Sequence, residues 1–322
     1  MKKKMTRKEK KEIRRKRRNR ALLGTAAVTA VTAGAAAAAA YQFTFGRTKI
    51  GHNLSLGTRS DEFNDAREYG AYKLRELNPE IYEIDSARGN RLKGFYYPCS
   101  DEPTGKIAFI VHGRHTEHRE AAGLYFEYYH KNGFDVFACD HTGAGESTGN
   151  LTGFGMYESE DCLLWLDFLY ERFGEDIQVV LHGFSMGAAT ILKFCDYCHE
   201  SVRFIVADSA YTDAASLLKP KAGVLYEPLR ILNALIAGYD LSDMQVISHV
   251  ADCDIPVLFV HGTEDTVVPF EMAEELYELH PGEKDCLFVE GAGHVEAMFK
   301  AKEEYEAKID EFIKKYIIDY KW

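Results

Sequence analysis

From about residue 80 onward, short apolar runs alternate with longer segments of helical spacing. Strands that alternate with helices form a largely parallel sheet with helices on both faces, so we predict one α/β domain over residues 46–322. We predict buried strands at 92–97, 107–111, 136–139, 179–181, 204–207, 257–260 and 287–289, and helices at 117–132, 157–173, 187–200, 271–279 and 295–318. The run at 81–85 has no helix between it and the next run, and should pair with that run as an antiparallel hairpin.

One stretch of about fifty residues, between the runs at 204–207 and 257–260, breaks this alternation. Leu225, Leu229, Leu232 and Ile236 repeat there at helical spacing. The stretch is too long for a plain crossover, so we interpret residues 212–248 as a helical insertion or lid. The alternative is an additional packed helix without a role in binding.

The N-terminal forty residues differ in composition from everything that follows. Residues 1–20 hold 13 Lys/Arg and two Glu, and the remaining chain holds 26 basic and 48 acidic residues. Such an acidic body argues against a nucleic-acid-binding domain. Residues 21–40 carry no charge, and twenty helical residues match the thickness of a bilayer core. Tyr41, Phe43 and Phe45 follow, where an interfacial aromatic belt would lie.

We therefore predict a basic cytoplasmic tail (1–20), a single transmembrane anchor (21–45) and a body outside the cytoplasm. Eleven of the residues in 21–40 are alanine, and A-x-A patterns at 36–38 and 38–40 also fit a cleaved signal peptide and a secreted body. A third interpretation is a solvated basic tail or an RNA-binding arm.

Seven cysteines, an odd number spread through the body, do not form a recognisable disulfide framework. We interpret the C-x-x-C spacing of Cys195 and Cys198 as core or helix-surface cysteines, because no second pair exists. This cysteine usage fits poorly with an exported body.

The strongest chemical signal is the sequence Gly183-Phe184-Ser185-Met186-Gly187, which fits G-x-S-x-G. It directly follows a predicted strand and directly precedes a predicted helix, which is the context of a nucleophile elbow. The glycines suit a sharp turn on which larger side chains would collide with their neighbours. We predict Ser185 to be a nucleophile.

A serine hydroxyl needs a base, and the base needs an orienting carboxylate. Asp265 follows the predicted strand at 257–260, and His294 follows the one at 287–289. Nucleophile, acid and base thus stand in the order and at the strand ends that a Ser–His–Asp site requires. The rivals are Glu264 as the acid and His261 or His280 as the base; we expect His261 to support the turn before Asp265.

An oxyanion hole needs two backbone N–H groups. We expect them from Met186, directly after the nucleophile, and from Arg114, in the loop after the strand at 107–111. His112, His115 and His118 recur every third residue, but no carboxylate or cysteine spacing completes a metal site. The glycine-rich stretch 140–149 matches no phosphate-binding pattern, so we expect a structural loop and no metal or organic cofactor.

Residues 90–318 resemble the α/β-hydrolase superfamily, in particular its bacterial serine aminopeptidase-like and monoacylglycerol-lipase-like branch. The resemblance rests on V-H-G at 111–113, D-H-T-G-A-G-E-S at 140–147, G-F-S-M-G at 183–187, H-G-T-E-D-T-V-V-P at 261–269 and G-A-G-H at 291–294. The loop after the fourth strand usually reads D-x-R-G-x-G-x-S in that branch. Here Thr142 replaces the arginine, so another residue must stabilise whatever that arginine stabilises in the related branch.

This resemblance implies an α/β-hydrolase fold and a serine hydrolase that cleaves an ester or related acyl bond of a small-molecule substrate. It is uninformative about substrate, because the superfamily hosts many chemistries. Two alternatives stay open. One is aminopeptidase-like hydrolysis of short peptides, and the other is a non-catalytic, membrane-anchored binding protein built on a hydrolase fold.

Overall fold

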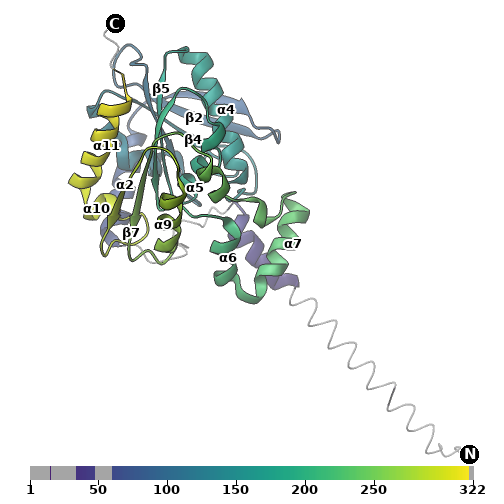
Figure 1. The fold of residues 1–322 in the computed structure, drawn as a ribbon. Coiled ribbons are helices and arrows are strands. Elements are labelled where there is room, and N and C mark those ends of the chain that lie inside the picture. Colours follow the sequence, from purple (N-terminus) through teal and green to yellow (C-terminus); the bar gives the residue numbers. More distant parts are fainter. Residues whose placement is uncertain (1–14, 16–33, 48–59, 319–322) are drawn as a thin grey trace, which may run out of the picture.

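The computed structural model describes Arg15, residues 34–47 and residues 60–318 of the chain (Figure 1). Its centre is an eight-stranded sheet of order β1-β2-β4-β3-β5-β6-β7-β8. The strands are β1 (Glu80–Asp85), β2 (Arg91–Tyr97), β3 (Lys106–Val111), β4 (Asp135–Asp140), β5 (Gln178–Phe184), β6 (Val202–Asp208), β7 (Val257–Gly262) and β8 (Lys284–Val289). Every predicted strand is present, extended by a few residues.

Strand β2 runs antiparallel to all the other strands of the sheet. It pairs antiparallel with β1 and with β4, whereas β4, β3 and β5 to β8 are parallel to one another. The predicted opening hairpin is therefore confirmed. Strands β4 and β5 are buried along their whole length, as expected of a sheet covered on both faces.

Two layers of helices enclose the sheet, and each covers its own apolar core. One face packs against α2 (Asp61–Arg75), α3 (His118–Lys131), α10 (Ala297–Lys300) and α11 (Lys302–Tyr316). The other packs against α4 (Met156–Phe173), α5 (Met186–Leu192), α8 (Ile247–Ala251) and α9 (Phe270–Leu279). Because both faces are covered, only the ends of the strands are open to carry a site.

Three helices differ from the sequence prediction. Helix α2 was not predicted, although Ser60 caps its first turn by accepting from the Phe63 amide. The predicted helix 187–200 ends at Leu192, because the chain turns to bury Phe194. The predicted helix 295–318 is split at Ala301, whose φ of −135° is not helical.

The residues between β6 and β7 are helical, as expected. They form α6 (Ala214–Ala222), α7 (Tyr226–Ile236) and α8, with short 3-10 turns between them. Figure 1 shows α6 and α7 at one end of the molecule, away from the C-terminus. We refer to residues 212–248 as the helical insertion.

Residues 34–45 form a helix that lies beside α6 and α7, drawn in purple in Figure 1. Phe45 has no exposed surface and Tyr41 only 4%, and both belong to the core that contains the helical insertion. These two side chains therefore pack inside the protein and do not form the expected interfacial belt. Beyond the helix, Gly46 pairs with Leu151 in an isolated β-bridge. We call residues 34–47 the N-terminal arm.

The predicted basic tail lies outside the described residues except for Arg15, and so does most of the predicted anchor. Among the residues that the structure does describe, no helix is both long enough and apolar enough to cross a bilayer.

We predict that Phe45→Ala lowers the free energy of unfolding by about 3–5 kcal/mol, because it leaves a phenyl-sized cavity in a closed core. Phe43→Ala is the matched control: this side chain is half-buried, and the loss should stay below about 1 kcal/mol. Urea denaturation of the full chain in detergent, followed by tryptophan fluorescence, measures both. A loss from Phe45→Ala as small as the loss from Phe43→Ala would mean that the arm does not belong to the core.

Candidate active site

Ser185 lies on the sharp turn between β5 and α5, with φ 55° and ψ −123°. This conformation is strained for a residue with a side chain, and costs of order 1–3 kcal/mol. Close packing holds the turn in place. A Cβ on Gly183 would lie 2.5 Å from the backbone of Gly187, and a Cβ on Gly187 would lie 2.1 Å from the carbonyl oxygen of Val111. Both glycines are therefore required sterically, as expected.

The structure brings Ser185, His294 and Asp265 together in one hydrogen-bonded row. Nε2 of His294 lies 2.9 Å from Oγ of Ser185, and Nδ1 lies 2.7 Å from Oδ2 of Asp265. An ionised carboxylate can only accept, so the ring proton sits on Nδ1 and Nε2 is left to accept from the serine hydroxyl. That is the arrangement in which a histidine can take the proton of a serine nucleophile.

Asp265 is held as a carboxylate by its surroundings. Its Oδ1 accepts from the amides of Val267 and Val268 at 2.7 and 2.8 Å. Burial by itself would raise its pKa, but hydrogen bonds from His261 and His294 outweigh burial and hold the pKa well below the ordinary range. His261, whose Nε2 lies 3.0 Å from the Val268 carbonyl, supports this turn as expected. The neighbouring Glu264 side chain is exposed and makes no contact with the row.

A buried pair that the sequence did not reveal, Asp208 and Ser209, joins all three parts of the row. The Asp208 carbonyl accepts from the Ser185 amide at 2.8 Å, and the Ser209 amide donates to Val260 in the acid-bearing strand at 2.8 Å. The Ser209 hydroxyl accepts from the Val295 amide, next to His294, at 3.2 Å, and donates to the Asp208 carboxylate. Burial raises the pKa of Asp208 to about 6.

Two backbone amides stay the predicted oxyanion donors, those of Met186 and Arg114. Met186 is the first residue of α5 and is buried, and Arg114 follows the end of β3. His112 shapes the loop between them: its Nε2 accepts from the His141 amide at 3.1 Å, so its Nδ1 carries the proton and donates to the Gly113 carbonyl at 2.7 Å. Burial lowers the pKa of His112, so the ring stays neutral in this role.

A cavity of about 270 Å³ opens next to Met186. Most of its walls come from three segments, the loop after β3, the loop 140–149 and the N-terminal arm, and Thr152 and Met186 complete them. They are lined by Gly46, Arg47, His112, His115, Thr116, Glu117, His141, Gly143, Ala144, Gly145, Thr152 and Met186.

Arg47, from the N-terminal arm, secures the loop 140–149. Its guanidinium donates to the carbonyls of Ser147, Gly149 and Gly145 at 2.7, 3.3 and 2.6 Å. Thr142, which stands where the related branch has arginine, instead donates to Asp161 at 2.7 Å. An arginine about one hundred positions away in sequence thus supports the loop. The substitution at 142 was the only sign of this in the sequence, and it does not point to residue 47.

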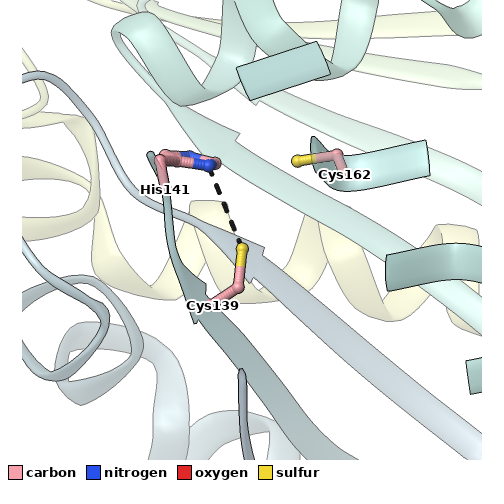
Figure 2. A group of neighbouring side chains, drawn as sticks. All are labelled: Cys139, His141 and Cys162. Carbon is pink, nitrogen blue, oxygen red and sulfur yellow. Dashed lines mark hydrogen bonds between the residues drawn. The ribbon is translucent and has the colours of Figure 1, made fainter. Parts of the chain in front are cut away.

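The three histidines at 112, 115 and 118 do not form one cluster. His118 is bonded to Asp140 at 3.0 Å, while His112 contacts His141. Figure 2 shows another soft-ligand group, Cys139 and Cys162 around His141, whose ligand atoms all lie within 4.8 Å of one another. Burial raises the pKa of both thiols, so a metal would have to displace two firmly held protons. We assign this group to the core beneath the loop.

Cys195 and Cys198 likewise carry free thiols, and burial raises the pKa of each well above the ordinary range of a thiol. Cys195 is buried and Cys198 half-buried, in and just after a short 3-10 turn following α5. A core or surface role fits these surroundings better than metal binding, because a thiolate would be needed for the latter.

Comparison with known proteins agrees with this architecture. The profile of the family described as "Serine aminopeptidase, S33" matches residues 102–239. "Uncharacterized protein YqkD" of Bacillus subtilis (strain 168) is 26% identical over 249 residues, covering 74% of this chain and 81% of that protein. Human "Alpha/beta hydrolase domain-containing protein 17C" is 26% identical over 251 residues, covering 75% and 68%.

Among solved structures, the esterase Pf2001 of Pyrococcus furiosus superposes with a TM-score of 0.62 at 22% identity, covering 76% of this chain and 94% of that one. The mostly parallel sheet, the elbow after β5 and these neighbours establish that the chain has the α/β-hydrolase fold.

We predict that Asp265→Asn lowers kcat by on the order of 10⁴, because an amide favours the wrong imidazole tautomer and cannot stabilise the imidazolium. Glu264→Gln is the matched control, since its side chain points to solvent, and it should keep wild-type turnover. Steady-state kinetics with a p-nitrophenyl ester measures both. A larger loss from Glu264→Gln would reassign the acid.

Proposed function

We propose that this protein is a serine hydrolase that cleaves a carboxylic ester, or a related acyl bond, through an acyl-enzyme. Ser185 attacks the acyl carbonyl while His294 takes its proton and returns it to the leaving group. Asp265 orients His294 and stabilises the imidazolium. Water, activated by the same histidine, then releases the acid and restores the serine. The chemistry requires no cofactor.

The observation that carries this proposal is the continuous row from Ser185 Oγ through His294 to Asp265, with contacts of 2.9 and 2.7 Å. A histidine with a purely structural role does not need a serine on a strained turn as its partner, and a serine with a purely structural role does not need the strain. A non-catalytic binding protein therefore gives no reason for the strained serine and the histidine beside it. The amides of Met186 and Arg114 are proposed to hold the negative charge that develops on the acyl oxygen.

The structure favours an ester over a peptide with a free N-terminus. A peptidase of that kind must bind an ammonium group with carboxylates near the site. The acidic side chains of the helical insertion are engaged locally: Asp213 caps α6, Asp240 and Glu227 pair with Arg230, and Asp243 accepts from the Asp240 amide. A series of p-nitrophenyl esters compared with aminoacyl-anilides tests this preference, and faster anilide cleavage would reverse it.

We predict that Ser185→Ala reduces ester hydrolysis by several orders of magnitude while leaving the fold unchanged, because the hydroxyl serves chemistry. A fluorophosphonate probe should label the wild type and fail to label the variant. Thermal denaturation checks the fold, and Ser216→Ala, at an exposed position of α6, is a control that should still be labelled. Near-wild-type turnover in folded Ser185→Ala would remove Ser185 from the mechanism.

The proposal extends to location. The uncharged segment 21–40 and the basic residues before it support a single-pass anchor with the tail in the cytoplasm and the body outside. The alternative is a body secreted after signal-peptide cleavage.

We predict that replacing Val28 and Val31 with Asp releases the protein from the membrane fraction, because a mid-helix Asp costs about 2.5–3.5 kcal/mol on insertion. The matched control replaces both with Leu and should stay bound. N-terminal sequencing separates the two locations: an anchored chain keeps Lys2, whereas a cleaved chain begins near Tyr41. Protection of the body from protease in intact cells, with release by high salt, would contradict the anchor.

A further inference from the structure

Four large apolar side chains are exposed in and just before α7, whose charged residues, Glu227 and Arg230, pair with each other. Val224, just before the helix, is 94% exposed, Ile231 51%, Leu235 76% and Ile236 55%. Ile231 and Leu235 are four residues apart in α7 and share one side of the helix, and Val224 stands in the 3-10 turn directly before it. Single exposed apolar residues need no explanation, but a continuous stripe of this kind marks a surface that another body covers.

The fold does not need this stripe. The opposite side of α7 already packs inward through Tyr226, Leu229 and Asn233, all of them buried. Asn233 donates to the Tyr239 carbonyl at 2.9 Å and accepts from Tyr41 of the N-terminal arm at 3.5 Å. A helix packed in this way on one side ordinarily turns a polar side to water.

The arm indicates what covers the stripe. Its helix lies against α7 through the contact between Tyr41 and Asn233, and its first described residue, Gly34, lies within the uncharged run 21–40. Thirteen basic residues precede that run. A bilayer that holds segment 21–40 therefore meets the protein at the arm, whose helix lies beside α7, and the basic residues before the run suit anionic lipid.

We propose that the exposed side of α7 is a membrane-docking surface, in which Val224, Ile231, Leu235 and Ile236 enter the interfacial layer of a lipid bilayer. The inference rests on the proposed membrane placement of segment 21–40 and goes beyond the proposed hydrolysis. A second copy of the chain is the competing occupant, and the test below distinguishes the two.

Docking would hold the helical insertion over the site. Lys221, in α6, donates to the carbonyl of Val267, whose amide binds the Asp265 carboxylate. Tyr239 donates to Gly153, close to the loop 140–149. A bilayer that contacts α7 thus contacts the helical insertion, and the insertion is bonded through Lys221 of α6 to the turn that carries Asp265.

The experiment uses the full chain reconstituted into vesicles of phosphatidylcholine and phosphatidylglycerol. Trp322→Phe leaves the buried Trp165 as the only native background, and Leu235→Trp adds a probe on the stripe. Brominated phosphatidylcholine quenches tryptophan that touches its acyl chains. We expect strong quenching of Leu235→Trp and none of the matched control Tyr69→Trp, which is 59% exposed on α2 over the other face of the sheet.

A second arm replaces Ile231 and Leu235 with Asp. Hydrolysis of a long-chain umbelliferyl ester embedded in the vesicles should fall about tenfold, because less apolar surface enters the bilayer. Hydrolysis of soluble p-nitrophenyl acetate by the same variant should not change. If the wild type itself does not hydrolyse p-nitrophenyl acetate, the proposed hydrolase function is overturned instead.

Each remaining outcome also decides the matter. If the chain does not float with the vesicles, or floats without quenching of Leu235→Trp, the surface does not dock on lipid. If Leu235→Trp is unquenched and the double Asp variant turns a dimer into a monomer, the stripe is an interface between two copies.

Discussion

The turn at Ser185 is the constraint on which the rest of the site depends. Its positive φ is unfavourable for a residue with a side chain, and it persists because β5, α5 and β3 meet there without room for a single extra carbon. The strain turns the hydroxyl outward, past the end of the sheet. Everything else in the site is arranged around the place where that hydroxyl emerges.

Two buried supports carry this arrangement outward. The Asp208–Ser209 pair ties the nucleophile turn, the acid-bearing strand and the histidine loop to one another through main-chain hydrogen bonds. Arg47 does the same for the loop 140–149 on the oxyanion side. Neither support belongs to the Ser185–His294–Asp265 row itself. A site supported in this way is preorganised, so little reorganisation is needed when charge develops.

The N-terminal arm connects three parts of the domain: the core, the loop 140–149 and the helical insertion. It contributes Phe45 to the core, Arg47 to a loop that lines the site, and a helix to the surface of the helical insertion. A segment that would otherwise be a simple tether thus becomes part of the domain. In the function that we propose, the segment that attaches the protein to the membrane therefore continues directly into residues that support the site.

The sequence by itself determined the sheet, the hairpin and the candidate nucleophile, acid and base. Strand and helix periods are local, and the residues of the elbow and of the two strand-end turns stand in short contiguous motifs. Only the tertiary structure decided the partners of Thr142 and Asp208, the role of Arg47 and the burial of Tyr41 and Phe45. Most of those contacts join residues far apart in the sequence, up to nearly two hundred positions, so no local pattern reveals them. The bonds of Arg47 also end on main-chain carbonyls, which require no particular residue.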